Sequence, residues 1–122
     1  MSDAPYRLLI VDDEPEILDV LSTYFSQEGP YEIMTAQHGA DAVMLAGFQR
    51  PHAVLLDILM PGMDGVEVLR AIRVMDPTIP VVMVTGNADV KIARDTLTIG
   101  AFDYVAKPFD CTALNQIGRA HV

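Results

Sequence analysis

The segment that decides the fold is Ala53–Gly65, which reads AVLLDILMPGMDG. Its first four residues are all apolar, a pattern typical of a strand that is buried on both faces of a parallel sheet. Asp57 ends this run, and a turn containing proline and glycine follows it. Open α/β sheets place their chemistry at the carboxyl ends of their strands, so we expect Asp57 to be a functional carboxylate.

Three other apolar runs end in polar groups in the same way. Asp12 and Asp13 follow the run Leu8–Val11, Thr85 follows Val81–Val84, and Lys107 follows Tyr104–Ala106. Parallel strands would bring all these ends to one edge of a sheet. The resulting set of carboxylates, hydroxyl and ammonium is suited to holding a divalent cation and a phosphoryl group.

Length and composition favour a single globular domain spanning residues 1–122. The chain is 51% hydrophobic and has a net charge of −9, and its apolar runs are far shorter than the ~20 residues of a membrane span. This acidity argues against direct binding of nucleic acid. Met1–Pro5 lacks the pattern of a signal peptide, and the single cysteine, Cys111, has no partner for an intrachain disulfide. We therefore expect a cytoplasmic location.

Apolar runs alternate along the chain with segments of helical periodicity. The predicted strands are Arg7–Val11, Tyr31–Ala36, Ala53–Asp57, Val81–Thr85 and Asp103–Ala106. The predicted helices are Pro15–Gln27, Gly39–Phe48, a third marked by Val66, Leu69 and Ile72, then Asp89–Ile99, and a fifth that begins around Leu114 and Ile117. Such alternation predicts an α/β fold with a parallel sheet that is covered by helices on both faces.

Some local features of these helices can also be predicted. Asp13 or Glu14 is expected to cap the first helix, because Pro15 suits a first helical turn. In the fourth helix we expect Ile92, Ala93 and Leu97 to face the core. The final residues, 118–122, make a poor helix end, which leaves open whether they are foreign to the protein or belong to a truncated last helix.

Four motifs together resemble the receiver domain of bacterial two-component response regulators. They are VDDE at 11–14, LDILMPGMDG at 56–65, VTG at 84–86 and GAFDYVAKPF at 100–109. The resemblance covers the chain from about Tyr6 to Thr112. It implies a flavodoxin-like, doubly wound sheet of five parallel strands in the order 2-1-3-4-5, with five helices.

The resemblance also implies a role for each residue of the predicted site. Asp57 would accept a phosphoryl group and, with Asp13 and the backbone carbonyl of Leu59, bind Mg²⁺ directly, while Asp12 would act mainly through water. Thr85 and Lys107 would contact the phosphoryl group, and the bond between Lys107 and Pro108 would be cis. Carboxylate oxygens that leave open positions are suitable ligands for Mg²⁺.

A switch function and its partners follow from the same resemblance. The donor would be a phosphohistidine on a sensor kinase or a phosphotransfer protein. Thr85 and Tyr104 would transmit phosphorylation to the face formed by the fourth helix, fifth strand and fifth helix. That face would control an output domain or partner, including a homodimer. The sequence leaves open whether the protein is a stand-alone regulator, the receiver of a DNA-binding regulator or part of a hybrid kinase. Residues 85–104 most resemble receivers attached to transcriptional activators. The domain would be regulatory, with only Mg²⁺-dependent self-phosphorylation and slow autodephosphorylation.

Two other functions are weighed against this interpretation. An aspartate-nucleophile phosphohydrolase needs a second aspartate two residues after the nucleophile, where this chain has Leu59. A receiver-like interaction module that is never phosphorylated usually lacks part of the site, whereas Asp12, Asp13, Asp57 and Lys107 are all present. His38, His52 and His121 show no metal-ligand spacing and are expected to be surface residues.

Overall fold

The computed structural model describes residues 6–58, 60, 62, 64–85 and 90–106. Within them the chain alternates strands and helices. The strands are β1 (Tyr6–Val11), β2 (Tyr31–Ala36), β3 (Ala53–Asp57), β4 (Val81–Thr85) and β5 (Asp103–Ala106). The helices are α1 (Pro15–Glu28), α2 (Gly39–Gln49), α3 (Gly65–Met75) and α4 (Val90–Ile99). The fifth predicted helix, around Leu114 and Ile117, lies outside the described residues.

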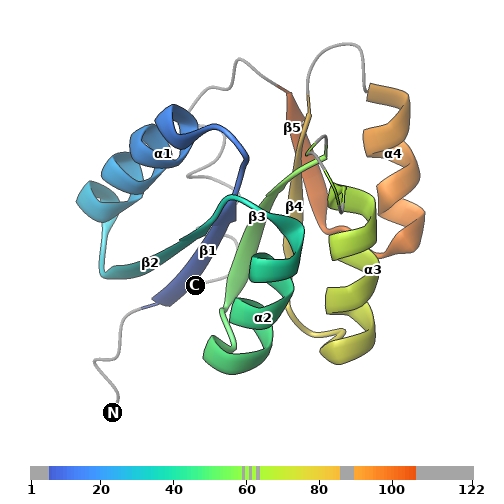
Figure 1. Ribbon diagram of the computed structural model, residues 1–122, viewed down its shortest axis with the longest axis horizontal. Coiled ribbons are helices and arrows are strands. Elements are labelled where there is room, and N and C mark those ends of the chain that lie inside the picture. The colour runs from blue at the N-terminus through green and yellow to red at the C-terminus, as the bar shows by residue number, and fades with distance from the viewer. Residues whose placement is uncertain (1–5, 59, 61, 63, 86–89, 107–122) are drawn as a thin grey trace.

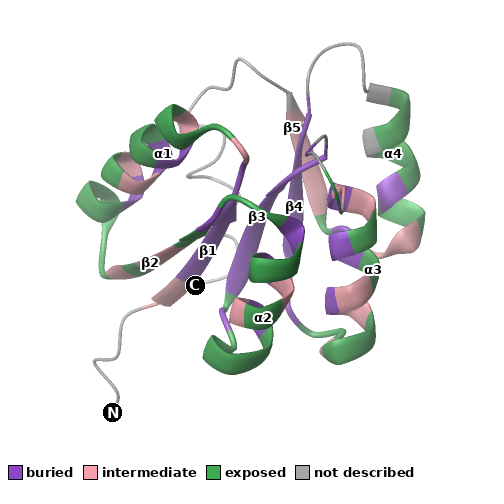
Figure 2. Ribbon diagram, in the orientation of Figure 1, coloured by how far each residue is buried: buried purple, intermediate pink, exposed green. Residues whose placement is uncertain are grey.

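The strands form one parallel sheet in the order β2-β1-β3-β4-β5, which confirms the expected α/β fold (Figure 1). β3 is the central strand, since Val11 pairs with Leu56 on one side and Asp57 pairs with Val84 on the other. All residues of β3 and β4 are buried, as their uninterrupted apolar sequences predict (Figure 2).

Alternate residues of each strand supply two cores, one on each face of the sheet. Leu9 and Val11 belong to the core that contains residues of α2 and α3, whereas Leu8 and Ile10 belong to the core that contains residues of α1. This is the period of two expected of a strand that is covered on both faces. α2 and α3 lie side by side in front of the sheet, and α1 lies apart from them (Figure 1).

The predicted position of the cap of α1 is confirmed. Glu14 occupies the N-cap position, but its side chain makes no capping hydrogen bond. The backbone N–H of Glu14 instead donates to Oδ1 of Asp12 at 2.9 Å. The short side chain of aspartate is suited to this contact, because it accepts a hydrogen bond from the backbone two residues further along the chain.

The predicted inner face of α4 is wrong for Ile92 and Leu97. Ile92 and Leu97 are 40% and 41% exposed, and among the described side chains of this helix the fully buried one is Thr96. The side chain of Ala93 lies outside the described part of the chain. α4 has apolar residues on more than one side, so their positions alone do not identify the stripe that faces β4 and β5. Figure 2 shows how much of this helix faces solvent.

Candidate functional site

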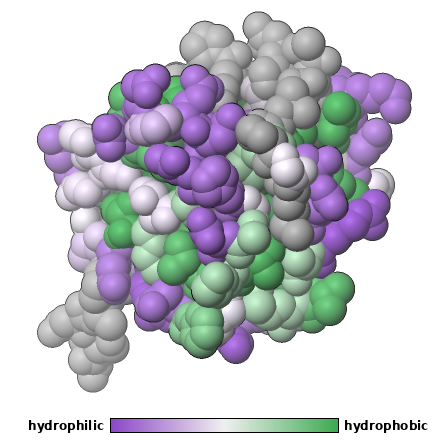
Figure 3. Space-filling view, in the orientation of Figure 1, coloured by the Kyte–Doolittle hydropathy of each residue, from purple (hydrophilic) through white to green (hydrophobic). Residues whose placement is uncertain are grey.

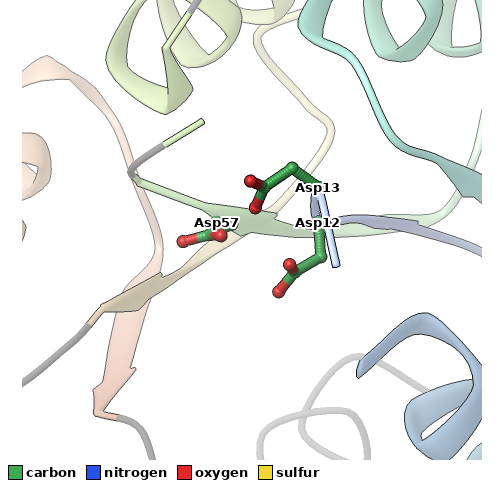
Figure 4. Close-up of side chains that lie close together, drawn as sticks. All are labelled: Asp12, Asp13 and Asp57. Carbon is green, nitrogen blue, oxygen red and sulfur yellow. The ribbon is translucent and has the colours of Figure 1, made fainter. Parts of the chain in front are cut away.

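Three carboxylates converge at the carboxyl end of the central strands (Figure 4). Asp12 and Asp13 follow β1 directly, and Asp57 is the last residue of β3. Each offers one carboxylate oxygen that lies within 4.8 Å of the oxygens offered by the other two. The predicted acidic cluster therefore exists, and parallel pairing of β1 with β3 creates it.

Burial differs among these three aspartates. Asp12 and Asp57 are only 2% and 6% exposed, while Asp13 is partly exposed. Buried carboxylates that face one another repel, and burial also removes the water that would otherwise stabilise their charge. A cation bound among them would relieve both costs. The exposure of Asp13 leaves a side from which solvent or a ligand can enter.

Backbone hydrogen bonds hold Asp12 in place. Its N–H donates to the carbonyl oxygen of Ala36 at 3.1 Å, which extends the pairing of β1 with β2 by one residue. Its Oδ1 accepts from Glu14 N, so one carboxylate oxygen is committed to the start of α1. Asp12 thus joins the acidic cluster to the first helix.

Thr85 and Tyr104 lie on the same face of the sheet. Thr85 ends β4, is 1% exposed, and pairs in register with Ala106, two residues beyond Tyr104. Met83, on the same side of β4 as Thr85, belongs to the core against which Tyr104 packs. Diagonal neighbours on adjacent strands are close enough for a long side chain to reach across. The hydroxyl and the aromatic ring are therefore placed to influence each other.

The start of α3 contains a feature that the sequence analysis missed. The carboxylate of Asp64 accepts from Glu67 N at 3.0 Å, and the carboxylate of Glu67 accepts from Asp64 N at 3.0 Å. This capping box fixes the beginning of α3. The signal was available, because an N-cap residue followed three positions later by glutamate is its sequence signature.

Some predicted site residues lie outside the described residues. These are Leu59, with its carbonyl ligand, and the pair Lys107 and Pro108, with their predicted cis bond. Their roles stay predictions. His52 and His38 are exposed, as predicted for surface histidines, and His121 lies outside the described range.

The chemistry of the three carboxylates fits Mg²⁺. This ion prefers oxygen ligands, keeps several of its waters, and is usually bound by one or two carboxylates together with a phosphate oxygen. Asp13 and Asp57 could supply direct ligands, and Asp12 could accept hydrogen bonds from metal-bound water. Bound Mg²⁺ would supply charge neutralisation for an incoming phosphoryl group.

Comparison with known proteins identifies the family. Residues 8–118 match the response regulator receiver domain. The chain belongs to this family. Receiver domains are regulatory signalling domains rather than enzymes, and they interact with histidine kinases or phosphotransfer proteins.

Two curated relatives and one crystal structure illustrate the relationship. The chain is 44% identical over 111 residues to regulatory protein AtoC of Escherichia coli (strain K12), covering 91% of this chain and 24% of AtoC. It is 38% identical over 116 residues to sporulation initiation phosphotransferase F of Bacillus subtilis (strain 168), covering 95% of this chain and 93% of the phosphotransferase. The receiver domain of NtrX from Brucella abortus superposes with a TM-score of 0.88 at 33% identity, covering 93% of this chain and 96% of the NtrX receiver.

These relatives differ in overall length. The receiver sequence spans about a quarter of AtoC and 44% of several transcriptional regulators that it also matches, but nearly all of the Bacillus phosphotransferase. Receivers similar to this one therefore occur both within longer transcriptional regulators and as almost the whole of a protein. In the described part of this receiver, no helix has the length and apolar character needed to span a membrane.

Proposed function

We propose that this receiver domain is a switch that is controlled by phosphorylation of Asp57. The observation that carries the proposal is the convergence of the Asp12, Asp13 and Asp57 carboxylates at the end of the central strands. Asp57 is the only one of the three that ends a strand of the sheet itself. A phosphohistidine donor on a sensor kinase or phosphotransfer protein fits this chemistry, and the proposed location of the exchange is the cytoplasm.

Transfer to Asp57 is a nucleophilic displacement at phosphorus. A carboxylate oxygen of Asp57 forms a new bond to phosphorus, and the bond between phosphorus and the donor's imidazole nitrogen breaks. The electron pair of that bond stays on the nitrogen, which takes up a proton. The product is an acyl phosphate, which water can hydrolyse slowly, so the signal is temporary. Asp12 and Asp13 would hold Mg²⁺, and Lys107 would supply positive charge beside the transferred group.

The phosphoryl group would bring about −2 charge to the edge of the sheet. A hydrogen bond from the Thr85 hydroxyl and another from Lys107 would each be charge-assisted and contribute about 1.5–3 kcal/mol. Together they approach the ~5.5 kcal/mol that converts a 1:99 population into 99:1. Both bonds form only after phosphorylation, so they can drive a change of state.

Movement of Thr85 toward the phosphoryl group would open space that the ring of Tyr104 can fill. The position of these residues on one face of β4 and β5 supports this relay. Ile92 and Leu97 on α4, and Phe102 just before β5, are 40–48% exposed. We propose that this face, with the residues that follow β5, docks a partner or a second copy after phosphorylation.

The proposed output is control of transcription. AtoC and several other relatives are named as regulatory or transcriptional regulatory proteins. The net charge of −9 makes this domain unsuited to binding DNA itself, so a separate domain or partner would do so.

Phosphorylation with a small donor tests the proposal. Acetyl phosphate and Mg²⁺ should add one phosphoryl group, detected by intact mass, and Asp57→Asn should abolish the addition. Asp41→Asn, which changes an exposed aspartate on α2, is the matched control and should be labelled like wild type. Undiminished labelling of Asp57→Asn would refute the assignment.

A further inference from the structure

A glycine at the start of α3 lies against the backbone of Asp57. Gly65 is buried, and its N–H donates to the carbonyl oxygen of Ile58 at 2.8 Å. A Cβ atom at residue 65 would overlap the carbonyl oxygen of Asp57 and would lie 2.7 Å from Cα of Ile58. These are backbone atoms, which cannot rotate away as the end of a side chain can.

The surrounding structure determines which atoms an added methyl group at residue 65 would displace. On one side, α3 is fixed by the Asp64–Glu67 capping box and by Val68, Leu69 and Ile72, which are fully buried. A shift of the helix would disturb close-packed core contacts along its length.

On the other side, most of β3 is held between two strands. Pairing with β1 ends at Leu56, so Asp57 keeps a strand partner only in β4, where it lies opposite Val84. The peptide between Asp57 and Ile58 is held to β4, where Ile58 N donates to the carbonyl oxygen of Val84 at 3.0 Å, but it lies beyond the last residue of β3 that pairs with β1. An added methyl group would displace this peptide before it displaced α3 or the body of the sheet.

We infer that Gly65 is a positioning residue: the absence of a side chain there sets the place of the Asp57 carboxylate within the Asp12–Asp13–Asp57 cluster. The inference rests on the proposed function for its consequence, since a displaced carboxylate would meet phosphorus and Mg²⁺ in the wrong position. It concerns packing rather than backbone conformation, because Gly65 is not among the glycines with positive φ.

Gly65→Ala is the direct test, with two controls. Gly47→Ala makes the same change in α2, where the new methyl group meets only Sδ of Met75 at 3.1 Å, the flexible end of a side chain. Val68→Ala removes buried volume from α3 and lowers stability, and it adds no atom that could push against the backbone of Asp57.

Three measurements, together with amide NMR signals, separate positioning from stability. They are the rate of phosphorylation by acetyl phosphate, Mg²⁺ affinity by calorimetry, and unfolding by urea. Gly65→Ala should lower the rate per folded molecule by roughly tenfold to a hundredfold, because a displacement near 1 Å has that effect on reacting groups. It should also weaken Mg²⁺ binding and shift the amide NMR signals of Asp57 and Ile58. The rates of both control variants should stay within about twofold of wild type.

If Gly65→Ala is partly unfolded, trimethylamine N-oxide can restore the folded fraction to that of Val68→Ala before rates are compared. A folded Gly65→Ala protein with wild-type rate and Mg²⁺ affinity would overturn the inference. Failure of the proposed function looks different, because wild type itself would then accept no phosphoryl group. Mg²⁺ affinity and the amide signals would still decide whether Gly65 positions Asp57.

Discussion

Arg7 and His52 exchange two hydrogen bonds across the starts of β1 and β3. Nδ1 of His52 accepts from Arg7 N at 2.8 Å, and His52 N donates to the carbonyl oxygen of Arg7 at 2.8 Å. The imidazole also stacks on Tyr6, with ring centroids 4.8 Å apart. The side chain of His52 thus adds one hydrogen bond to the beginning of the sheet, and it can do so only while Nδ1 carries no proton.

This geometry predicts a pH dependence of stability. Burial lowers the pKa of His52 below its ordinary value, and the positive charge of Arg7 lowers this pKa further. The unfolded chain, with a His pKa near about 6.5, then binds the proton more readily than the folded protein does. The contribution of this contact to the free energy of unfolding has its full value above about pH 7. It decreases as the pH falls through about 6.5 toward the folded-state pKa of His52.

Urea unfolding between pH 8 and pH 5 checks this prediction. His52→Asn should reduce the loss of stability on acidification, because Asn offers an uncharged acceptor at the same distance from the backbone. His38→Gln, a change at the other described histidine, should leave the loss as it is in wild type. An unchanged pH dependence in His52→Asn would contradict the assignment.

Mg²⁺ should stabilise the folded protein, and Asp13→Ala should remove most of that effect. Clustered carboxylates repel without a cation, so Asp13→Ala should unfold at a higher temperature than wild type when EDTA is present. At a Mg²⁺ concentration of 100 times Kd, binding would stabilise wild type by about 2.7 kcal/mol. Thermal unfolding with and without Mg²⁺ measures both effects, and Asp19→Ala on the exposed side of α1 is the control. An equal response in Asp13→Ala and wild type would place the metal elsewhere.

Gly100 and Arg73 should be energetically coupled. Gly100 has φ +124°, and a Cβ atom there would lie 2.8 Å from Cδ of Arg73. The Arg73 side chain cannot easily withdraw, because its Nη1 donates to the carbonyl oxygens of Pro77 at 3.1 Å and Gly100 at 3.4 Å. Its Nε and Nη2 are buried and have no hydrogen-bond partner among the described residues.

A double-mutant cycle measures this coupling. Gly100→Ala should destabilise the protein strongly, through both its backbone conformation and its contact with Arg73. In the Arg73→Ala background only the backbone cost remains, so we expect a coupling of about 0.5–3 kcal/mol from urea unfolding. Gly47→Ala should show no coupling to Arg73→Ala. Additive effects of Gly100→Ala and Arg73→Ala would show that the contact is unimportant.

The sequence predicts the central strands well because β3 and β4 are apolar runs with clear boundaries. Ala53–Asp57 and Val81–Thr85 agree with the structure at both ends. The acidic cluster is predictable for the same reason, since strand ends in a parallel sheet share one edge. The inner face of α4 cannot be predicted in this way, because Ile92 and Leu97 fit the apolar pattern and yet face solvent.

Contacts between distant parts of the chain are also hidden from sequence patterns. His52 reads as a surface histidine, and its bond to Arg7 spans 45 positions. Gly65 belongs to a recognisable turn, but only the structure shows that its missing side chain makes room for the backbone of Asp57. Periodicity reports which face of an element is apolar, whereas such contacts depend on how elements are placed relative to one another.

Thr85→Ala should separate phosphorylation from its effect on the surface of the domain. The hydroxyl of Thr85 is not the nucleophile, so Asp57 should still accept a phosphoryl group at a rate close to that of wild type. Without the hydroxyl, the hydrogen bond that draws residue 85 toward the phosphoryl group is lost, at about 1.5–3 kcal/mol. The active state of the phosphorylated variant would then be populated roughly tenfold to a hundredfold less.

NMR with the phosphoryl mimic beryllofluoride tests this relay. In wild type the signals of Tyr104 and of α4 should shift on addition of the mimic, and in Thr85→Ala these shifts should be much smaller at equal occupancy of Asp57. Thr98→Ala is a suitable control, because Thr98 is exposed on α4 and its hydroxyl donates only to the carbonyl oxygen of Asp95 within its own helix. If Thr85→Ala responds as fully as wild type, the change at α4 does not pass through Thr85 and Tyr104.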